Sequence, residues 1–324
     1  MKDLASIVIP CYNQAAYIGD AIESAINQSH PRVEVIVIDD GSTDGSREVI
    51  ETFADQIRYE RQVNQGAPEA RNRGLKMASG TYVKFLDADD VLLAQAVERQ
   101  VERAEALDGE RKAIVYGEAV WVDEDGNEIS GHNLRPRDSG EDPVAHILSS
   151  NPLTSCPLHR RKYLVEVGGF APSVPRGQEF DLHLRLVLAG VSFEYNPMPV
   201  YRYRHYDDQS RISGQGYSGD DPQALRKVVL RHEELIREQR GSLAERIRVL
   251  LARRLWAYGR GILREGMPDA AEPYFAEARR LAGRNGIEGH FPYPTLAASL
   301  GPKYAEICLG AVKDTVSFLK TPFR

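Results

Sequence analysis

The chain has 324 residues, of which 42% are hydrophobic and 27% charged, so it can bury a sizeable core and form about two domains. Its formal net charge of -6 at pH 7 argues against broad nucleic-acid binding. Three widely spaced cysteines, Cys11, Cys156 and Cys308, argue against a disulfide framework and a structural zinc site, and favour a reducing compartment.

The start of the chain and its hydropathy predict a protein without a membrane span. A strand-like run that ends at Pro10 is too short for a secretory signal. No stretch approaches the roughly eighteen consecutive apolar residues that a spanning helix needs. We therefore expect a cytoplasmic protein.

The first part of the chain alternates strand-like runs of β-branched residues with amphipathic, helix-like stretches. In order, the sequence predicts a strand at 6–9, a helix at 18–26, a strand at 33–38, a helix around 49–53, a strand at 57–61, a helix at 67–77 and a strand at 81–86. This alternation predicts an α/β fold with a Rossmann-like, mainly parallel sheet flanked by helices. Ligands of such a sheet bind at the carboxyl ends of its strands.

Polar residues follow three of the predicted strands, at 10–13, 39–42 and 87–90. The last of these stretches reads Asp-Ala-Asp-Asp, so three carboxylates follow a buried strand within four residues. Their mutual repulsion favours a nearby positive charge, and a divalent cation with oxygen ligands is the main candidate. The alternative is that one of these acids caps a helix at 94–107. The predicted first strand is followed by Pro-Cys-Tyr-Asn-Gln and not by a G-x-G-x-x-G loop, and the chain has no G-x-x-x-x-G-K-[ST] loop, which disfavours the common dinucleotide and P-loop folds.

Four motifs stand in this part of the chain, namely Ser6-Ile7-Val8-Ile9-Pro10-Cys11-Tyr12-Asn13, Ile38-Asp39-Asp40-Gly41-Ser42-Thr43-Asp44, Asn64-Gln65-Gly66 with Ala70-Arg71-Asn72, and Phe85-Leu86-Asp87-Ala88-Asp89-Asp90. Together, and in this order, they resemble the family 2 glycosyltransferases of GT-A fold. Each motif alone is a weak signal, whereas four in the family's order over about 90 residues are specific. The resemblance is fainter up to about Ser213 and does not cover roughly the last hundred residues.

The resemblance implies a site for a nucleotide-sugar donor at these strand ends. The implied donor-binding residues are Pro10, Tyr12, Asn13, Asp40, Gly66, Arg71, Asp87 and Asp89. Asp40 would accept a hydrogen bond from the base of the donor, in a pocket lined by Pro10 and Tyr12. The implied ligands of a Mn²⁺ or Mg²⁺ cofactor are Asp89, Asp87, Asp90 and His205. Taken singly, Tyr12, Asn13 and Arg71 also fit ordinary roles as a half-buried aromatic, a turn former and a solvated helix residue.

The catalytic base is expected in the stretch Gly177-Gln178-Glu179-Phe180-Asp181, which leads into a helix-like run. Similar segments of the family read E-D-x-D-L-x-L-R, and their second acid is the usual candidate for the base. Glu179 stands at that place and is our candidate. The chain departs from the pattern, since Gln178 and Glu179 replace Glu and Asp, and the longer Glu179 side chain moves its carboxylate by about one bond length. Asp181 is the second candidate, or else an acid that favours the helix dipole.

The remaining sequence predicts a change of architecture. Two short strands, at 113–117 and 120–123, would extend the sheet toward an acceptor side. The predicted domains are a GT-A domain at 1–215, with a nucleotide-binding half at about 1–112 and an acceptor half at about 113–215, and a helical C-terminal region at 220–324. The stretch 307–319 is amphipathic, and peripheral membrane contact is the minority interpretation of it.

We therefore predict an inverting, metal-dependent glycosyltransferase. It would move a sugar from a nucleotide-diphosphate donor, most simply a UDP-sugar, to a hydroxyl of a glycan, a lipid-linked precursor or a protein, in the synthesis of cell-surface polysaccharide or glycoconjugates. The alternatives are a non-catalytic nucleotide-sugar-binding or scaffold protein, and a nucleotidyltransferase, whose usual Gly-rich first loop the chain lacks. No nucleic-acid partner is expected, while association with the inner face of a membrane and a homo-oligomer remain open.

Overall fold

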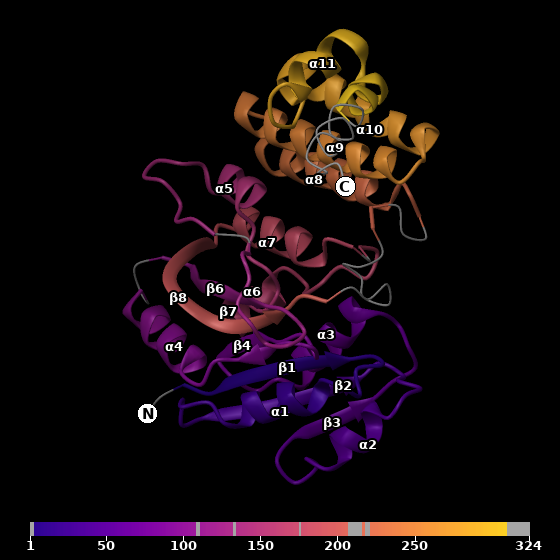
Figure 1. The fold of residues 1–324 in the computed structure, drawn as a ribbon. Helices are drawn as coiled ribbons and strands as arrows, with labels where there is room; N and C mark the ends of the chain where they lie inside the picture. The colour runs from indigo at the N-terminus through magenta and orange to yellow at the C-terminus, as the bar shows by residue number, and fades with distance from the viewer. Residues whose placement is uncertain are drawn as a thin grey trace. The chain divides into compact units, whose positions relative to one another are not determined.

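The computed structural model describes residues 3–107, 111–131, 134–174, 176–206, 216–217 and 221–309. The chain divides into two compact units, an N-terminal unit at Met1–Asp207 and a helical unit at Asp208–Arg324 (Figure 1).

The first part of the N-terminal unit is a parallel α/β sheet. Its elements are β1 (Ala5–Cys11), α1 (Ile18–Ile26), β2 (Val33–Asp39), α2 (Ser46–Glu51), β3 (Arg58–Arg61), α3 (Ala67–Met77) and β4 (Tyr82–Phe85). The strand order is β3-β2-β1-β4, and all three pairings are parallel. The right-handed connections place α1 and α2 on one face of the sheet and α3 on the other. The α/β fold with its flanking helices is therefore confirmed.

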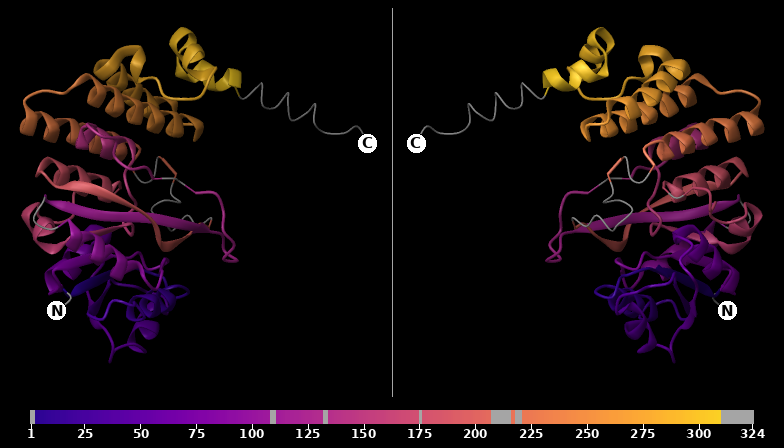
Figure 2. Two further views of the ribbon diagram at one scale, coloured as in Figure 1. Left: turned by 90° about the vertical axis from the view of Figure 1, so that its left-hand side faces the viewer. Right: turned by 90° about the vertical axis from the view of Figure 1, so that its right-hand side faces the viewer.

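The second part of this unit continues the same sheet with mixed strand directions (Figure 1; Figure 2 gives two side views). Its elements are β5 (Val91–Leu92), α4 (Ala96–Ala106), β6 (Ala113–Val122), α5 (Pro143–Ser149), β7 (Pro157–Arg160), α6 (Arg161–Glu166), α7 (Gln178–Leu188) and β8 (Ser192–Arg204). From β4 outward the order is β7-β6-β8-β5, and β7 runs antiparallel to both β4 and β6. The sheet is thus parallel on the side of β1 and mixed beyond β4.

The expectation of two separate strands at 113–117 and 120–123 is wrong, because β6 runs without a break from Ala113 to Val122. Its pairing with β8 shifts register between Tyr116 and Ala119, as at a β-bulge, so the strand bends and continues. Gly117 lies at this bend, where a Cβ atom would stand 2.5 Å from the carbonyl oxygen of Met198. Gly117 therefore permits close approach of the two backbones rather than ending the strand.

The helical unit contains α8 (Ala224–Arg240), α9 (Glu245–Arg264), α10 (Pro268–Ala282) and α11 (Tyr293–Leu300). Trp256 of α9 packs edge-on against Phe275 of α10, with 4.8 Å between ring centroids, and its indole nitrogen donates to the Tyr293 hydroxyl at 3.2 Å. The predicted C-terminal helices are therefore present. Among the described residues no helix is long and apolar enough to cross a membrane. Most of the amphipathic stretch 307–319 lies outside those residues.

Candidate active site

The loops that follow β1 and β2 are bonded to each other at the carboxyl edge of the sheet. The Asn13 amide nitrogen donates to the Ser42 hydroxyl at 3.0 Å, and the Asn13 side-chain oxygen accepts from the Thr43 amide at 2.8 Å. Asn13 adopts φ 52°, a left-handed conformation that asparagine tolerates better than most residues. Asn13 therefore joins the two loops, while the neighbouring Tyr12 ring is 47% exposed.

Asp40, at the end of β2, is almost fully buried and organises the start of α3. Its carboxylate accepts hydrogen bonds from the Gln62 side chain at 2.7 Å, the Gln65 amide at 2.9 Å and the Gly66 amide at 2.8 Å. A carboxylate offers about four acceptor positions, so one position remains for a further N–H donor. Gly66 has φ 87°, which requires glycine, and Pro68 stands in the first turn of α3. The structure thus brings the predicted residues Asp40 and Gly66 together.

The three carboxylates after β4 each have a different partner. Asp87 pairs with the Arg71 guanidinium at 2.6 Å, and Asp89 accepts from the Tyr206 hydroxyl at 3.1 Å. Asp90 is buried and accepts from the Ser155 hydroxyl at 3.4 Å.

Sequence reasoning missed Tyr206 and Ser155. Their only signals are a run of alternating rings and charges at 201–206 and a polar residue just before β7.

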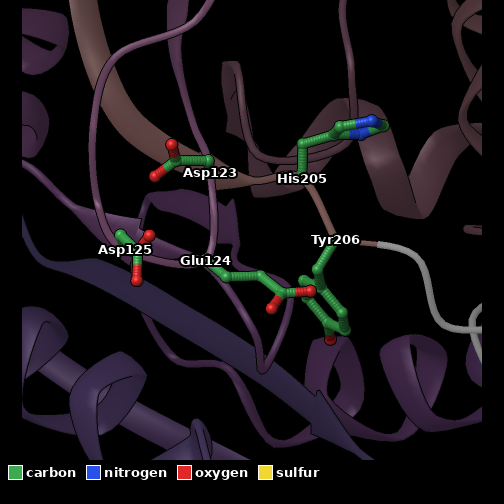
Figure 3. Close-up of a pocket in the computed structure, with 5 residues that line it drawn as sticks. All are labelled: Asp123, Glu124, Asp125, His205 and Tyr206. Atoms are coloured by element: carbon green, nitrogen blue, oxygen red, sulfur yellow. The ribbon is translucent and has the colours of Figure 1, made fainter.

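The predicted metal ligands do not form a ready-made metal centre. Within the described ranges, no three His, Cys, Asp or Glu side chains are arranged to hold an ion. His205 lines an open pocket of about 310 Å³ with Asp123, Glu124, Asp125 and Tyr206 (Figure 3). The His205 and Tyr206 side chains point in opposite directions there, as neighbours in an extended chain do. Tyr206, rather than His205, is the residue that the structure places on Asp89.

The loop after β4 nevertheless suits a divalent cation. Asp87 and Asp89 supply carboxylate oxygens, the ligand type that Mg²⁺ and Mn²⁺ prefer. Sites for these ions in phosphate-handling proteins commonly hold the metal with one or two carboxylates, and waters and substrate phosphates complete the ligand set. The residues present therefore fit the cofactor, and Asp89 and Asp87, beside their bonds to Tyr206 and Arg71, are the side chains that could hold it.

Arg71, on α3, is buried against three parts of the N-terminal unit. Besides Asp87, its guanidinium donates to the Gln178 side-chain oxygen at 2.5 Å. It also lies over the Phe170 ring, 5.3 Å from the centroid. Arg71 is therefore no solvated helix residue, because it connects the loop after β4 to the start of α7.

The two candidate bases lie in the first turn of α7, which begins after Gly177. Asp181 is 1% exposed and forms an ion pair with Arg185, one turn later, at 2.7 Å. Arg185 also donates to the Val167 carbonyl at 2.7 Å, so this pair fixes the helix to the preceding loop. Glu179 is only partly buried. Access therefore favours Glu179 as the base, and both assignments stay predictions.

The strand that precedes the three carboxylates contains a buried lysine. Lys84, on β4, is completely buried, and its ammonium nitrogen donates to the Gln100 side chain at 2.8 Å and to the Cys156 carbonyl at 3.1 Å. Burial lowers the pKa of Lys84 to about 7. Ser155, next to Cys156, accepts from the Asp87 amide at 3.3 Å, so this polar cluster continues to the surface loop.

Comparisons with known proteins agree with this architecture. The family model described as glycosyl transferase family 2 matches residues 6–168. An uncharacterized glycosyltransferase of Rickettsia conorii is 32% identical over 224 residues, which cover 65% of this chain and 36% of that protein. Chondroitin synthase of Escherichia coli is 32% identical over 220 residues, which cover 64% of this chain and 30% of that protein. The chain thus spans about a third of the length of these curated relatives.

A solved structure extends the likeness to nearly the whole chain. The crystal structure of S. aureus TarS 1-349 in complex with UDP-GlcNAc matches with a TM-score of 0.67 at 17% identity, covering 95% of this chain and 92% of that one. At this identity the match shows a shared fold, that of a GT-A glycosyltransferase. Because the family model matches just over half of its residues and the fold agrees, the chain belongs to glycosyl transferase family 2.

Proposed function

We propose that this glycosyltransferase is an inverting, metal-dependent enzyme that uses a UDP-sugar donor. The observation that carries the proposal is the placement of Asp40, Asp87 and Asp89 at the carboxyl ends of the parallel strands β2 and β4. Asp40 keeps an acceptor position for an N–H group of the nucleotide base. The carboxylates of Asp87 and Asp89 can accept hydrogen bonds from ribose hydroxyls and can bind a divalent cation. The complex of TarS with UDP-GlcNAc supports the choice of a uridine nucleotide.

The proposed reaction is a single displacement at the anomeric carbon. Glu179 takes the proton of the acceptor hydroxyl as general base, while the acceptor oxygen forms a bond to the anomeric carbon. The bond from that carbon to the diphosphate oxygen breaks, and UDP leaves with the electron pair. A divalent cation at Asp89 and Asp87 would stabilise the negative charge on the departing diphosphate. Inversion follows because no covalent sugar–enzyme intermediate forms.

The proposed acceptor is a hydroxyl group of a glycan, a lipid-linked precursor or a protein in polysaccharide or glycoconjugate synthesis. The similarity to chondroitin synthase supports this setting. The chain matches only about a third of the length of such relatives, so this class of acceptor is proposed from the matching segment alone.

Calorimetric titration with UDP, dTDP and GDP, each with and without Mn²⁺, tests the donor site. We expect UDP to bind tightly only with the metal, and Asp89→Ala to abolish this metal effect. UDP-sugars are then screened for transfer, and the anomeric configuration of the product is read by NMR. A product that retains the donor's configuration would overturn the displacement mechanism, and equal binding with and without Mn²⁺ would overturn the metal assignment.

A further inference from the structure

Arg71 joins two segments that are far apart in the sequence. One branch of its guanidinium donates to Asp87, 16 residues away, and the other to Gln178, 107 residues away. The Arg71 side chain is 8% exposed and the Asp87 side chain 34% exposed, so the bond to Gln178 is buried and the bond to Asp87 is partly accessible to solvent. Hydrogen bonds from a charged donor are stronger than neutral ones, and the planar fork of arginine also fixes their direction. The distance between the loop after β4 and the first turn of α7 is therefore set through one rigid group.

The neighbours of Arg71 fix α3 to the loop between α6 and α7. Asn72 donates to the Phe170 carbonyl and accepts from the Phe170 amide, both at 2.8 Å. A Cβ atom on Gly169 would stand 2.4 Å from the Asn72 side-chain oxygen, so a glycine at this position leaves room for the Asn72 side chain. The Phe170 ring then supports the guanidinium from one side. These contacts hold Arg71 in the orientation that reaches Gln178.

We propose that Arg71 and Gln178 are positioning residues that fix Glu179 relative to the donor-side carboxylate Asp87. This inference rests on the proposed function, in which Glu179 is the base. Gln178 is the first residue of α7 and Glu179 the second, so a shift of the helix start moves the base directly. A misplacement of about 1 Å can cost about 100-fold in rate, which makes such a bond consequential for turnover. The atom required is the side-chain oxygen of Gln178, which accepts from Arg71.

Two substitutions of Gln178 isolate that oxygen. Gln178→Leu keeps comparable bulk in a side chain one bond shorter and removes the acceptor, whereas Gln178→Glu keeps an acceptor oxygen for Arg71 and adds one negative charge. We expect Gln178→Leu to lower kcat at least about 10-fold, with the Kd for UDP unchanged within about twofold. Gln178→Glu should keep kcat within about threefold of wild type. Gln56→Leu, at an exposed position, is the matched control and should change neither quantity.

Turnover is measured as UDP release from the UDP-sugar that wild-type protein uses best. Wild-type kcat in Gln178→Leu, or an equal loss in Gln178→Glu and Gln178→Leu, would overturn the positioning role. A loss of UDP binding in Gln178→Leu would place this residue in the donor site instead, which also overturns the inference.

A stability measurement tests the bridge without turnover. Asp87→Asn, Gln178→Leu and the double variant form a thermodynamic cycle of thermal unfolding. Because Arg71 connects the two sites, we expect the double variant to lose about 2 °C less in Tm than the sum of the single losses. Strictly additive losses would refute the bridge. A wild-type protein that transfers no sugar would refute the proposed function, and the cycle would still decide whether the bridge exists.

Discussion

Replacing Lys84 by methionine should change how the stability of the N-terminal unit depends on pH. Burial lowers the folded-state pKa of this lysine from 10.5 to about 7. Between these values the unfolded chain binds more protons than the folded one, so stability rises with pH in wild type. Lys84→Met removes the titrating group. It also removes the hydrogen bonds from the Lys84 ammonium to Gln100 and to the Cys156 carbonyl.

The size of the effect follows from the two pKa values. From pH 7.0 to 8.5 the Lys84 contribution to the free energy of unfolding should increase by about 1.5 kcal/mol. Urea unfolding gives the free energy of unfolding of wild type and of Lys84→Met at each pH. The difference between the two proteins at pH 8.5, minus their difference at pH 7.0, is the Lys84 contribution, because the effects of all other titrating groups cancel. Lys76→Met, at an exposed position, is the control and should show no such pH-dependent difference. If the stability difference between wild type and Lys84→Met stays constant within about 0.5 kcal/mol from pH 7.0 to 8.5, Lys84 titrates normally and the reasoning is wrong.

Three further substitutions test the donor site. Tyr206→Phe removes the hydroxyl that donates to Asp89 and should weaken Mn²⁺-dependent UDP binding about fivefold, as measured by calorimetry. Tyr17→Phe is the control, because the Tyr17 ring packs on Tyr206, and this substitution should leave UDP binding unchanged. Asp40→Asn takes a charged acceptor from backbone amides and should lower the free energy of unfolding by about 2 kcal/mol in urea, while unchanged stability would mean that the amide oxygen suffices. Gly66→Ala forces a side chain into φ 87° and should cost about 1–2 kcal/mol in the same assay, and a neutral result would show that the loop relaxes.

The parallel half of the fold could be predicted from sequence because its signals are local. Buried runs such as Ile7 to Ile9 form β1, and the helical spacing of Ile18, Ala21 and Ile22 gives the buried face of α1. The mixed half was harder to predict, since strand direction depends on pairings between distant segments. Gly117 shows the difference, because a glycine within a strand-like run fits both a break and a bulge.

The proposed donor-site residues Asp40, Gly66, Asp87 and Asp89 could be predicted from the sequence because they belong to motifs that follow strands. Tyr206 and Ser155 could not, since each meets its aspartate only after the chain returns from a distant part of the sheet. For Ser155 the cause is the antiparallel direction of β7. Because β7 runs antiparallel to β4, the first residues of β7 lie beside the last residues of β4. A parallel strand would place its last residues there instead.

The bonds between the loops after β1 and β2 have a thermodynamic consequence for donor capture. Asn13 joins Ser42 and Thr43, and the amide nitrogens of Gln14 and Ala15 donate to Ser46 and Asp44 at 2.8 and 3.0 Å. In the proposed donor site, these loops are already ordered before a nucleotide binds, so little conformational entropy would be lost there on binding. Discrimination between bases would then depend on rigid shape and on the acceptor position of Asp40. A wrong base would leave a polar group without a hydrogen-bond partner instead of reshaping the loop.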